Sequence, residues 1–463
     1  MNIVILVLLI AAEIMLAVIG ISRKMIVKDF VKLRVAANIV ELVIGLLAVI
    51  TKQGSLSLRF GGLLALLVVR AVFALIFWLV DHKKTTGKKK SSVILGVVFS
   101  IVFFINSIIP AFIFSNYKGL PTSGEYEVKT VNAILKDESR IETFENDGSC
   151  REVPLYFYYP EVEEGEASKE FPLVFFSHGA FGYYQSNTST YMELASRGYV
   201  VVSVEHPHHS FFTKDTDGKV VIVDPEFISN AGRIQNTDEV SDEETFEITK
   251  EWMELRLGDM NFAIDEVKRA ASENSLNDSW YCKDLSEMSE VLALIDVETI
   301  GVMGHSLGGA AAVTLGRERD DIDAVIDIDG TMIGEIDGVR EGNDLVSEEP
   351  YDVPLLVFDN VEHLNERVDV GNSNILYVNN VILKNATTGY ATCIMGSGHM
   401  NYTDLPLFSP LLAGLLGTGD VDSEACIAKM NEITADFLDY YLKGEGEFAV
   451  EETYELPQDK DHG

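Results

Sequence analysis

Four long apolar stretches fill the N-terminal part of the chain, at 3–21, 34–50, 60–80 and 92–114. Each approaches the roughly 20 residues that an α-helix needs to cross the hydrocarbon core of a bilayer, although the second is short and contains Glu41. The pattern therefore predicts a transmembrane bundle of four helices within residues 1–118. A cleaved signal peptide is the alternative for the first stretch, but the stretch has neither a basic leader nor a small-residue cleavage site.

Beyond residue 118 the apolar runs become short and alternate with amphipathic segments. Patterns typical of buried strands occur at 171–176, 199–204, 300–303, 324–328, 355–358 and, more weakly, 391–395. Helical spacing of apolar residues marks the segments 191–196, 251–270 and 427–442. Strands that alternate with helices predict a mostly parallel sheet with helices on both faces.

Charge divides the chain at the same point. Residues 1–118 contain 14 of the 36 Lys and Arg residues but only 4 of the 72 Asp and Glu residues, so their net charge is +10 and that of the remainder is −46. We therefore expect a membrane region at 1–118, an α/β domain at 119–450 and an acidic tail at 451–463. The acidic surface disfavours nucleic-acid binding. Acidic runs at 238–247 and 335–349 are expected to be solvated insertions, with gating of an active site as the alternative.

Basic residues between the apolar stretches predict the orientation of the bundle. The second connection has only Lys52 and Arg59, whereas the first and third each have five basic residues: Arg23, Lys24, Lys28, Lys32 and Arg34, and Lys83, Lys84, Lys88, Lys89 and Lys90. By the positive-inside rule the basic connections are cytoplasmic, so the N-terminus and the α/β domain face outward.

All four cysteines lie in this outer part, where disulfides persist, and their spacing does not select a pairing: Cys150, Cys282, Cys393 and Cys426.

Three charged residues fall near the centres of the predicted spans: Glu13, Glu41 and Arg70. A charge within the hydrocarbon core is costly unless it is paired inside the bundle. We therefore expect Arg70 to contact Glu41 or Glu13. The alternative is that one of these stretches does not span.

The sequence GHSLGG at 304–309 follows the apolar run 300–303 and precedes a run of small residues. This order of strand, tight turn and helix is typical of a nucleophile elbow, in which a serine is raised out of the sheet to where a base can take its proton. Gly304 and Gly308 fit because a side chain at either position would collide with the neighbouring strand or helix. We therefore predict an α/β-hydrolase fold with Ser306 as the nucleophile. A glycine-rich turn with a capping serine is the alternative.

A serine nucleophile needs a base and an orienting acid, which in this fold follow in the order Ser, Asp or Glu, His. His399 fits best as the base, because it lies in a glycine-containing loop just after the predicted strand 391–395. His363 follows a strand too closely, and His462 lies in the tail.

Three aspartates near strand ends are candidates for the acid: Asp327, Asp329 and Asp359. Asp327 and Asp329 share a face of their strand, but Asp329 lies at the carboxyl edge beside Gly330, where a loop can direct it to the imidazole. Asp359 ends the next strand, which is where many α/β-hydrolases carry the acid. The residues alone leave Asp329 and Asp359 as alternatives.

The oxyanion of such a reaction needs two amide donors. The N–H of Leu307, directly after the serine, and that of Ala180, in the loop after the strand 171–176, are the predicted pair. His178 in the same loop is assigned a local structural role beside Gly179.

Three further histidines lie close together in sequence: His206, His208 and His209. We expect them to line the cleft and not to bind a metal, because Pro207 separates them and no convergent partner is evident. No metal or cofactor is expected.

Six blocks occur in order along the α/β domain: FFSHG at 175–179, LASRGY at 194–199, VEH at 204–206, GHSLGGA at 304–310, DIDGTM at 327–332 and GHMNY at 398–402. Together they resemble the platelet-activating factor acetylhydrolases over most of 154–401. In that family the acid lies on the strand after the elbow in an Asp-x-x-Met context, so the resemblance implies Asp329, with Met332, as the acid. The resemblance also implies a calcium-independent lipase that removes short or oxidised acyl groups from the sn-2 position of phospholipids. Thr331 stands where the family usually has tryptophan, and the secreted members lack the N-terminal bundle.

The sequence thus predicts a membrane-tethered, extracytoplasmic serine esterase with the triad Ser306, Asp329 and His399, acting on short-acyl or lipid esters. A peptidase or an acyltransferase with the same triad is one alternative. The other is a membrane sensing or binding module that keeps only the form of a hydrolase. The sequence leaves the oligomeric state open.

Overall fold

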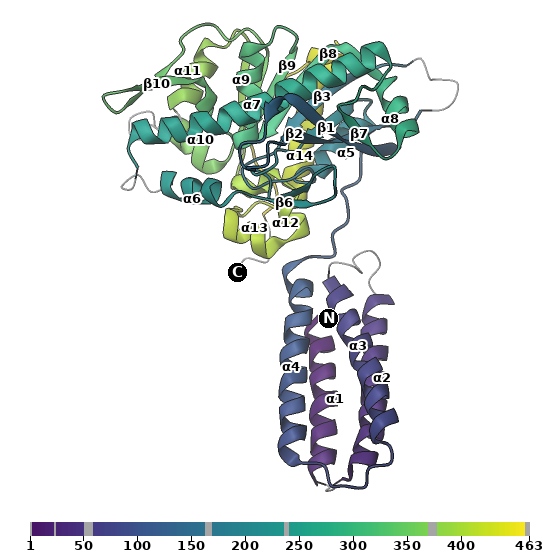
Figure 1. Cartoon of the computed structure of the whole chain (residues 1–463). Coiled ribbons are helices and arrows are strands. Elements are labelled where there is room, and N and C mark those ends of the chain that lie inside the picture. The colour runs from purple at the N-terminus through teal and green to yellow at the C-terminus, as the bar shows by residue number, and fades with distance from the viewer. Residues whose placement is uncertain are drawn as a thin grey trace. The chain divides into compact units, whose positions relative to one another are not determined.

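The computed structural model describes residues 2–22, 25–50, 59–162, 169–235, 240–368 and 377–458. The chain divides into two compact units (Figure 1). The first contains Met1–Lys118 together with Pro406–Leu415, and the second contains Gly119–Leu405 and Leu416–Gly463. All four cysteines are described and none forms a disulfide; Cys393 and Cys426 are buried.

Four long helices form most of the first unit (Figure 1): α1 Asn2–Ser22, α2 Val27–Ile50, α3 Gly61–Asp81 and α4 Lys90–Ile113. By length and composition, three segments of the described residues can cross a membrane: Ile3–Ser22, Gly61–Asp81 and Lys90–Ile113. Helix α2 is as long as α4, at 24 residues, but it is less hydropathic because four charged residues occupy 28–34. Of the four predicted spans, three are candidate membrane spans in the structure. The second, α2, is a helix of more polar composition.

A buried cluster of charged side chains connects these helices. Glu13 of α1, which is fully buried, lies 2.7 Å from Arg34 of α2 and also pairs with Arg70 of α3. Arg70 lies 3.1 Å from Glu41 of α2, and its Nη1 donates to Ser100 Oγ of α4 at 2.7 Å. The predicted contact of Arg70 with Glu41 or Glu13 is confirmed, and Arg70 makes both contacts. Two acids and two arginines balance in charge, which lowers the cost of placing ionised groups inside an apolar bundle.

A short segment from late in the chain completes the first unit. It consists of α12 Leu405–Phe408 and α13 Pro410–Leu416. The amide of Ser115 donates to the Phe408 carbonyl at 2.8 Å, and Ser409 Oγ donates to the carbonyl of Ile113, at the end of α4, at 2.8 Å. The sequence analysis does not predict this association, because Ser409 and Ile113 are separated by 296 positions.

A ten-stranded sheet forms the centre of the second unit, in the order β14-β13-β12-β9-β8-β3-β4-β2-β1-β7. The strands are β1 Val128–Ile141, β2 Cys150–Pro160, β3 Phe171–Ser177, β4 Val200–Val204, β7 Trp280–Cys282, β8 Ile295–His305, β9 Ala324–Ile328, β12 Leu355–Asp359, β13 Gly389–Ile394 and β14 Thr453–Tyr454. The seven strands from β14 to β4 are parallel, which confirms the predicted mostly parallel sheet, and β2, β1 and β7 extend it antiparallel. The pair β1–β2 is absent from the sequence-based predictions. Strand β1 alternates buried and less buried residues, as an antiparallel strand with one solvated face does, and β2 is buried along most of its length. Strand β14 lies within the predicted tail at 451–463.

Helices pack on both faces of this sheet (Figure 1): α5 Thr188–Ser196, α7 Asp242–Glu273, α8 Leu285–Leu292, α9 Leu307–Glu318, α10 Val361–Val368, α11 Tyr377–Asn385 and α14 Ser423–Leu442. Helix α6 Pro225–Ile234 instead packs through Phe227 against α7 and α9. Successive residues of β3 point to opposite faces. Leu173 and Phe175 belong to the core that α7, α9 and α11 complete, whereas Val174 and Phe176 belong to the core with α5 and α14. The continuous apolar run of β3 is thus buried on both sides.

The two acidic runs have different structures. The run 335–349 contains the partly exposed hairpin of β10 Ile336–Arg340 and β11 Asn343–Val346, as expected of a surface insertion. Residues 238 and 239 of the other run lie outside the described residues, and its later part begins α7. Ser241 caps that helix, because its Oγ accepts from the Glu244 amide at 3.2 Å. Acidic residues in the first turn match the positive end of the helix dipole, so this part of the run is a helix start and not an insertion.

Candidate active site

Ser306 lies at the turn between β8 and α9. Its backbone has a positive φ of 56°, which is strained for a residue with a side chain. A Cβ on Gly304 would overlap the carbonyl of Gly308, and a Cβ on Gly308 would overlap the carbonyl of Ser177. The turn therefore closes only because both positions are glycine, and the predicted order of strand, tight turn and helix is confirmed.

Two backbone amides near Ser306 are free to donate. The amide of Leu307 belongs to the first turn of α9, where a helix leaves its N–H groups without intrahelical acceptors. The amide of Ala180 donates no hydrogen bond within the described part of the chain. Gly179 brings that loop against the elbow, because a Cβ on it would lie 3.1 Å from Ser306 Cβ and 2.9 Å from His305 Nδ1.

Asp329 and His399 meet beyond the carboxyl ends of the strands. His399 begins the turn η3 His399–Tyr402, and its Nδ1 donates to Asp329 Oδ2 at 2.6 Å. The backbone and side-chain amides of Asn360 donate to the same carboxylate at 2.7 and 2.8 Å. Burial opposes the ionised form, but hydrogen bonds and charge from His363 and His399 hold the pKa of Asp329 well below its usual range.

The other two candidate acids are bonded elsewhere. Asp359 Oδ2 accepts from Arg367 Nε at 2.6 Å, and burial raises the pKa of its carboxyl. Asp327 is fully buried, and its Oδ1 accepts from the Gly330 amide at 3.0 Å. Burial, and then the charges of Asp359 and Asp329, raise the pKa of Asp327 well above its usual value. Among the three, Asp329 is the one hydrogen-bonded to the imidazole of His399.

His399 lies beside the residue that precedes Ser306. The rings of His305 and His399 are 4.5 Å apart between centroids, and His305 Nε2 lies 3.1 Å from the His399 carbonyl oxygen. Burial, and then the imidazole of His399, lower the pKa of His305 to about 3, so His305 is neutral at physiological pH. Ser306 and His399 are both described and share no hydrogen bond. In hydrolases without substrate this contact is often long and tightens when substrate binds.

A second histidine lies against the other oxygen of Asp329. His363 Nδ1 is 2.9 Å from Asp329 Oδ1, and the rings of His363 and His399 are 6.5 Å apart between centroids. His363 is not among the predicted site residues because it follows a strand closely. That same position just after β12 brings it to the site. Strands β9 and β12 are parallel neighbours, so the residues just after Ile328 and just after Asp359 meet at one edge of the sheet.

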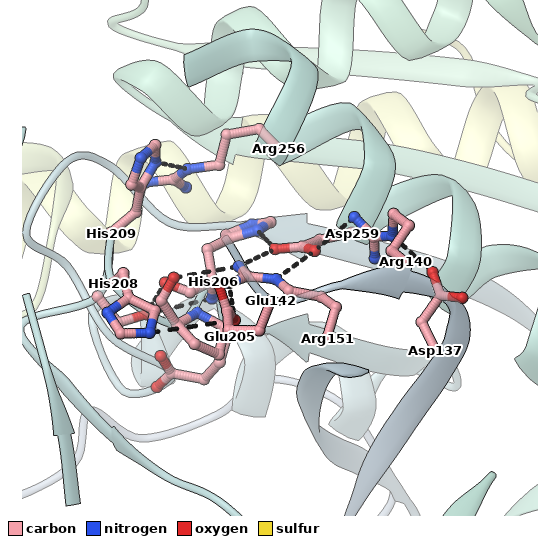
Figure 2. Close-up of polar contacts among 12 residues, drawn as sticks. Asp137, Arg140, Glu142, Arg151, Glu205, His206, His208, His209, Arg256 and Asp259 are labelled. Atoms are coloured by element: carbon pink, nitrogen blue, oxygen red, sulfur yellow. Dashed lines mark hydrogen bonds and ion pairs between the residues drawn. The ribbon is translucent and has the colours of Figure 1, made fainter. Parts of the chain in front are cut away.

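A buried polar network, part of which Figure 2 shows, supports the loop of Ala180. Arg256 of α7 is fully buried, and it donates from Nη1 to the His178 carbonyl at 2.5 Å and from Nη2 to the Gly179 carbonyl at 3.3 Å. His178 Nδ1 also donates to the Gly179 carbonyl, at 2.7 Å, which confirms the local role predicted for His178. Because a trans peptide points its C=O and N–H in opposite directions, these donors fix the direction of the Ala180 N–H.

Arg256 is absent from the sequence-based predictions, although the sequence contains a signal for it. It lies between Met253 and Met260 on the buried stripe of α7, where an isolated charge requires partners. Burial lowers its pKa to about 9 against the opposing influence of Asp259 and Glu205, so the guanidinium is charged at neutral pH.

The histidines of the following loop have separate partners (Figure 2). His206 donates from Nδ1 to Asp259 Oδ2 at 3.1 Å, and the ring of His209 stacks on Phe227 at 3.9 Å between centroids. Both are buried, so the prediction that they line the cleft was wrong, whereas His208 is partly exposed. Within the described ranges no group of three or more His, Cys, Asp or Glu side chains is placed to hold a metal ion.

A hollow of about 640 Å³ opens beside His399. It is lined by residues of three segments, at 360–366, 397–399 and 416–418. The volume is in the range of small-molecule sites. The hollow reaches the imidazole of His399, and Ser306 is not part of its lining.

Comparison with known proteins agrees with this geometry. The family model for platelet-activating factor acetylhydrolase, isoform II, matches residues 160–460. The platelet-activating factor acetylhydrolase of Bos taurus is 25% identical over 283 residues, which are 59% of this chain and 58% of that protein. The Gallus gallus protein of the same name is 24% identical over 299 residues, or 60% of this chain and 64% of that protein. The chain thus spans about three fifths of the length of these relatives.

Among solved structures, a ferulic acid esterase from Streptomyces cinnamoneus is similar in fold, with a TM-score of 0.51 and 20% sequence identity. The similarity covers 71% of this chain and 93% of the esterase. The chain therefore shares its overall fold with that structure. Because the family model covers most of the chain, and the motif blocks lie in the predicted order within it, this protein belongs to the platelet-activating factor acetylhydrolase, isoform II, family.

Proposed function

We propose that the chain is a serine ester hydrolase in which Ser306 is the nucleophile, His399 the general base and Asp329 the orienting acid. The 2.6 Å hydrogen bond between His399 and Asp329, beside a strained serine, is the observation that carries the proposal. His399 takes the hydroxyl proton as Ser306 Oγ attacks the ester carbonyl, and returns it to the leaving alcohol as the acyl-enzyme forms. Water, activated by the same imidazole, then releases the acid and regenerates the serine. Asp329 stays ionised and holds the tautomer that leaves Nε2 of His399 free.

The amides of Leu307 and Ala180 form the proposed oxyanion hole. Both lie near Ser306, and the Ala180 amide has no acceptor in the described part of the chain. Fixed donors of this kind stabilise the charge that develops on the carbonyl oxygen in the transition state.

Short-acyl or lipid esters are the proposed substrates. The family and its curated relatives support this class, and the hollow beside His399 supplies space for part of an ester. Three helices suited to a membrane, together with the basic connections between them, support a domain tethered on the outer side of a bilayer. Such a tether keeps the active site near lipid esters.

A fluorophosphonate probe and a panel of substrates test this proposal on the purified full-length protein. We expect the probe to label Ser306, and short-acyl p-nitrophenyl esters and short sn-2-acyl phospholipids to be hydrolysed. Cleavage of peptides without cleavage of esters would favour a peptidase, and acyl transfer to an added alcohol in preference to water would favour an acyltransferase. Absence of labelling in a folded protein would favour a binding module, because only an activated serine reacts with the probe.

Arg256→Lys is expected to lower kcat for ester hydrolysis about 10-fold while KM changes little, because the lysine ammonium lacks the planar fork with which Arg256 holds the carbonyls of His178 and Gly179 together. The Gly179 carbonyl belongs to the same peptide as the Ala180 amide. The loss falls on kcat because the oxyanion exists only in the transition state. Steady-state kinetics with one activated ester measure it. Arg269→Lys, on the exposed side of the same helix, is the matched control and should match the wild type. An unchanged kcat in a folded Arg256→Lys protein would count against the role of the Ala180 loop.

A further inference from the structure

The carboxylate of Asp329 lies between two histidines. Its Oδ2 accepts from His399 Nδ1 at 2.6 Å, and its Oδ1 lies 2.9 Å from His363 Nδ1. The carboxylate is fully buried, so both contacts are shielded from water. The proposed triad uses one of these imidazoles, and the other has no part in the mechanism above.

The first turn of α10 places His363 at Asp329. Strand β12 ends at Asp359, and Asn360 Oδ1 accepts from the His363 amide at 2.8 Å, which starts the helix. Asn360 also donates to both oxygens of Asp329, so one residue positions the carboxylate and the histidine together. The positive end of a helix dipole disfavours a cation in the first turn. The contact with Asp329 must therefore offset that cost if His363 carries a charge.

The surroundings of His363 favour its charged form. Asp329 faces it from the end of β9, Asp359 from the end of β12 and Glu366 from its own helix. Burial lowers the proton affinity of the ring, but these acids outweigh burial and raise the pKa of His363 to about 9. Arg367 of the same helix is occupied by Asp359, at 2.6 Å. His363 is thus an imidazolium at neutral pH.

We propose that His363 is a positioning residue that shares the Asp329 carboxylate with His399 and, as a cation 6.5 Å from that ring, opposes a second positive charge on His399. The kinetic consequence rests on the proposed function of His399 as general base. His399 accepts the serine proton only when its ring is neutral. His363 therefore extends the active range of the enzyme toward lower pH.

The size of the effect follows from the distance. A unit charge at about 6.5 Å, in an effective dielectric constant of about 40, between that of the protein interior and that of bulk water, shifts a neighbouring titration by about one pH unit. Among the described residues, Asp329, His363 and His305 at the end of β8 face His399, and Glu362 and Glu366 of α10 line the hollow beside it. Both glutamates are present in the wild type and in His363→Gln, so their influence on His399 is common to the two proteins. His305 is neutral above about pH 3, so it does not compete with His363. Without the His363 charge, Asp329 alone acts on His399 and favours its protonated form. The acid limb of the pH profile of kcat/KM, where activity rises as His399 loses its proton, then moves to higher pH.

The test compares the pH profiles of kcat/KM for the wild type and His363→Gln, with full-length protein and one activated ester. The acid limb of His363→Gln is expected about one pH unit above that of the wild type, with a plateau within about threefold. His208→Gln, which removes a partly exposed histidine that does not contact Asp329, is the matched control and should leave the limb in place. An acid limb at the same pH in wild type and His363→Gln would overturn the proposal.

A titration of the protein labelled with 13C in histidine separates this inference from the proposed function, because it requires no turnover. The His399 resonance, assigned by its loss in His399→Gln, should titrate about one pH unit higher in His363→Gln than in wild type. This result in a protein without esterase activity would keep the coupling and reject the proposed function. Coincident titrations would reject the coupling. If His363→Gln does not fold, the wild type alone tests whether His363 is a cation. Its His363 resonance is then expected to titrate above about pH 8. A resonance that titrates near the ordinary value of about 6.5 would reject the cation.

Discussion

Ser306→Ala is expected to lower ester turnover by about 10³-fold or more while leaving the fold intact. The substitution removes only the hydroxyl, which has no hydrogen-bond partner among the described residues, so no buried group loses a contact. The backbone strain at φ 56° is present with either side chain. The remaining rate comes from the oxyanion donors and from binding, which position the ester for attack by water. Initial rates with an activated short-acyl ester, together with fluorophosphonate labelling, measure the loss.

The matched control for this substitution is Ser289→Ala. Ser289 lies on the exposed side of α8, where its hydroxyl donates to the Leu285 carbonyl one turn earlier. Its removal should leave turnover and labelling unchanged. Retained turnover or labelling in folded Ser306→Ala protein would refute the nucleophile assignment.

Asp329→Asn is expected to lower kcat by about 10⁴-fold, because an amide that donates to His399 Nδ1 selects the tautomer in which Nε2 carries the proton and cannot act as a base. The asparagine retains the size of the side chain and tolerates the positive φ of 57° at this position. The amide is a poorer acceptor for the Asn360 donors and does not pair with a cationic His363, so a loss of stability is expected beside the loss of chemistry. The pH dependence of kcat and the thermal unfolding of the same preparation distinguish the two.

Asp359→Asn separates the two acids that the residues alone leave open. Asp359 is hydrogen-bonded to Arg367, so its replacement is expected to reduce stability and to change kcat by less than about 10-fold. A 10⁴-fold loss in Asp359→Asn, with Asp329→Asn active, would show that the acid lies on β12.

The candidate site is assembled from loops that leave one edge of the sheet. Ser306 follows β8, Asp329 follows β9, and Asn360 follows β12, and these three strands are adjacent and parallel. Parallel strands bring their carboxyl ends together, so residues far apart in the chain meet without a dedicated connection. The arrangement also explains why His363 reaches the same carboxylate as His399.

Features that depend on local patterns can be predicted from the amino-acid sequence. The elbow follows from Gly304 and Gly308, since only residues without a Cβ allow the turn to close. The central strands follow from continuous apolar runs such as that of β3, and the membrane-type helices from long apolar stretches. The contact of Arg70 with both glutamates follows from the cost of a lone charge in an apolar bundle.

Which of several similar residues meet depends on the folded chain. Asp327, Asp329 and Asp359 all lie near strand ends, and the distinction arises because Asp329 turns at a positive φ toward His399 whereas Asp359 meets Arg367. The support of the Ala180 loop by a helix more than 70 positions away, and the packing of α12 and α13 with the N-terminal unit, likewise join distant parts of the chain. The cause is the same in each case. A periodic pattern predicts which face of a helix or strand is buried, but it does not indicate which polar side chain of another segment will contact that face.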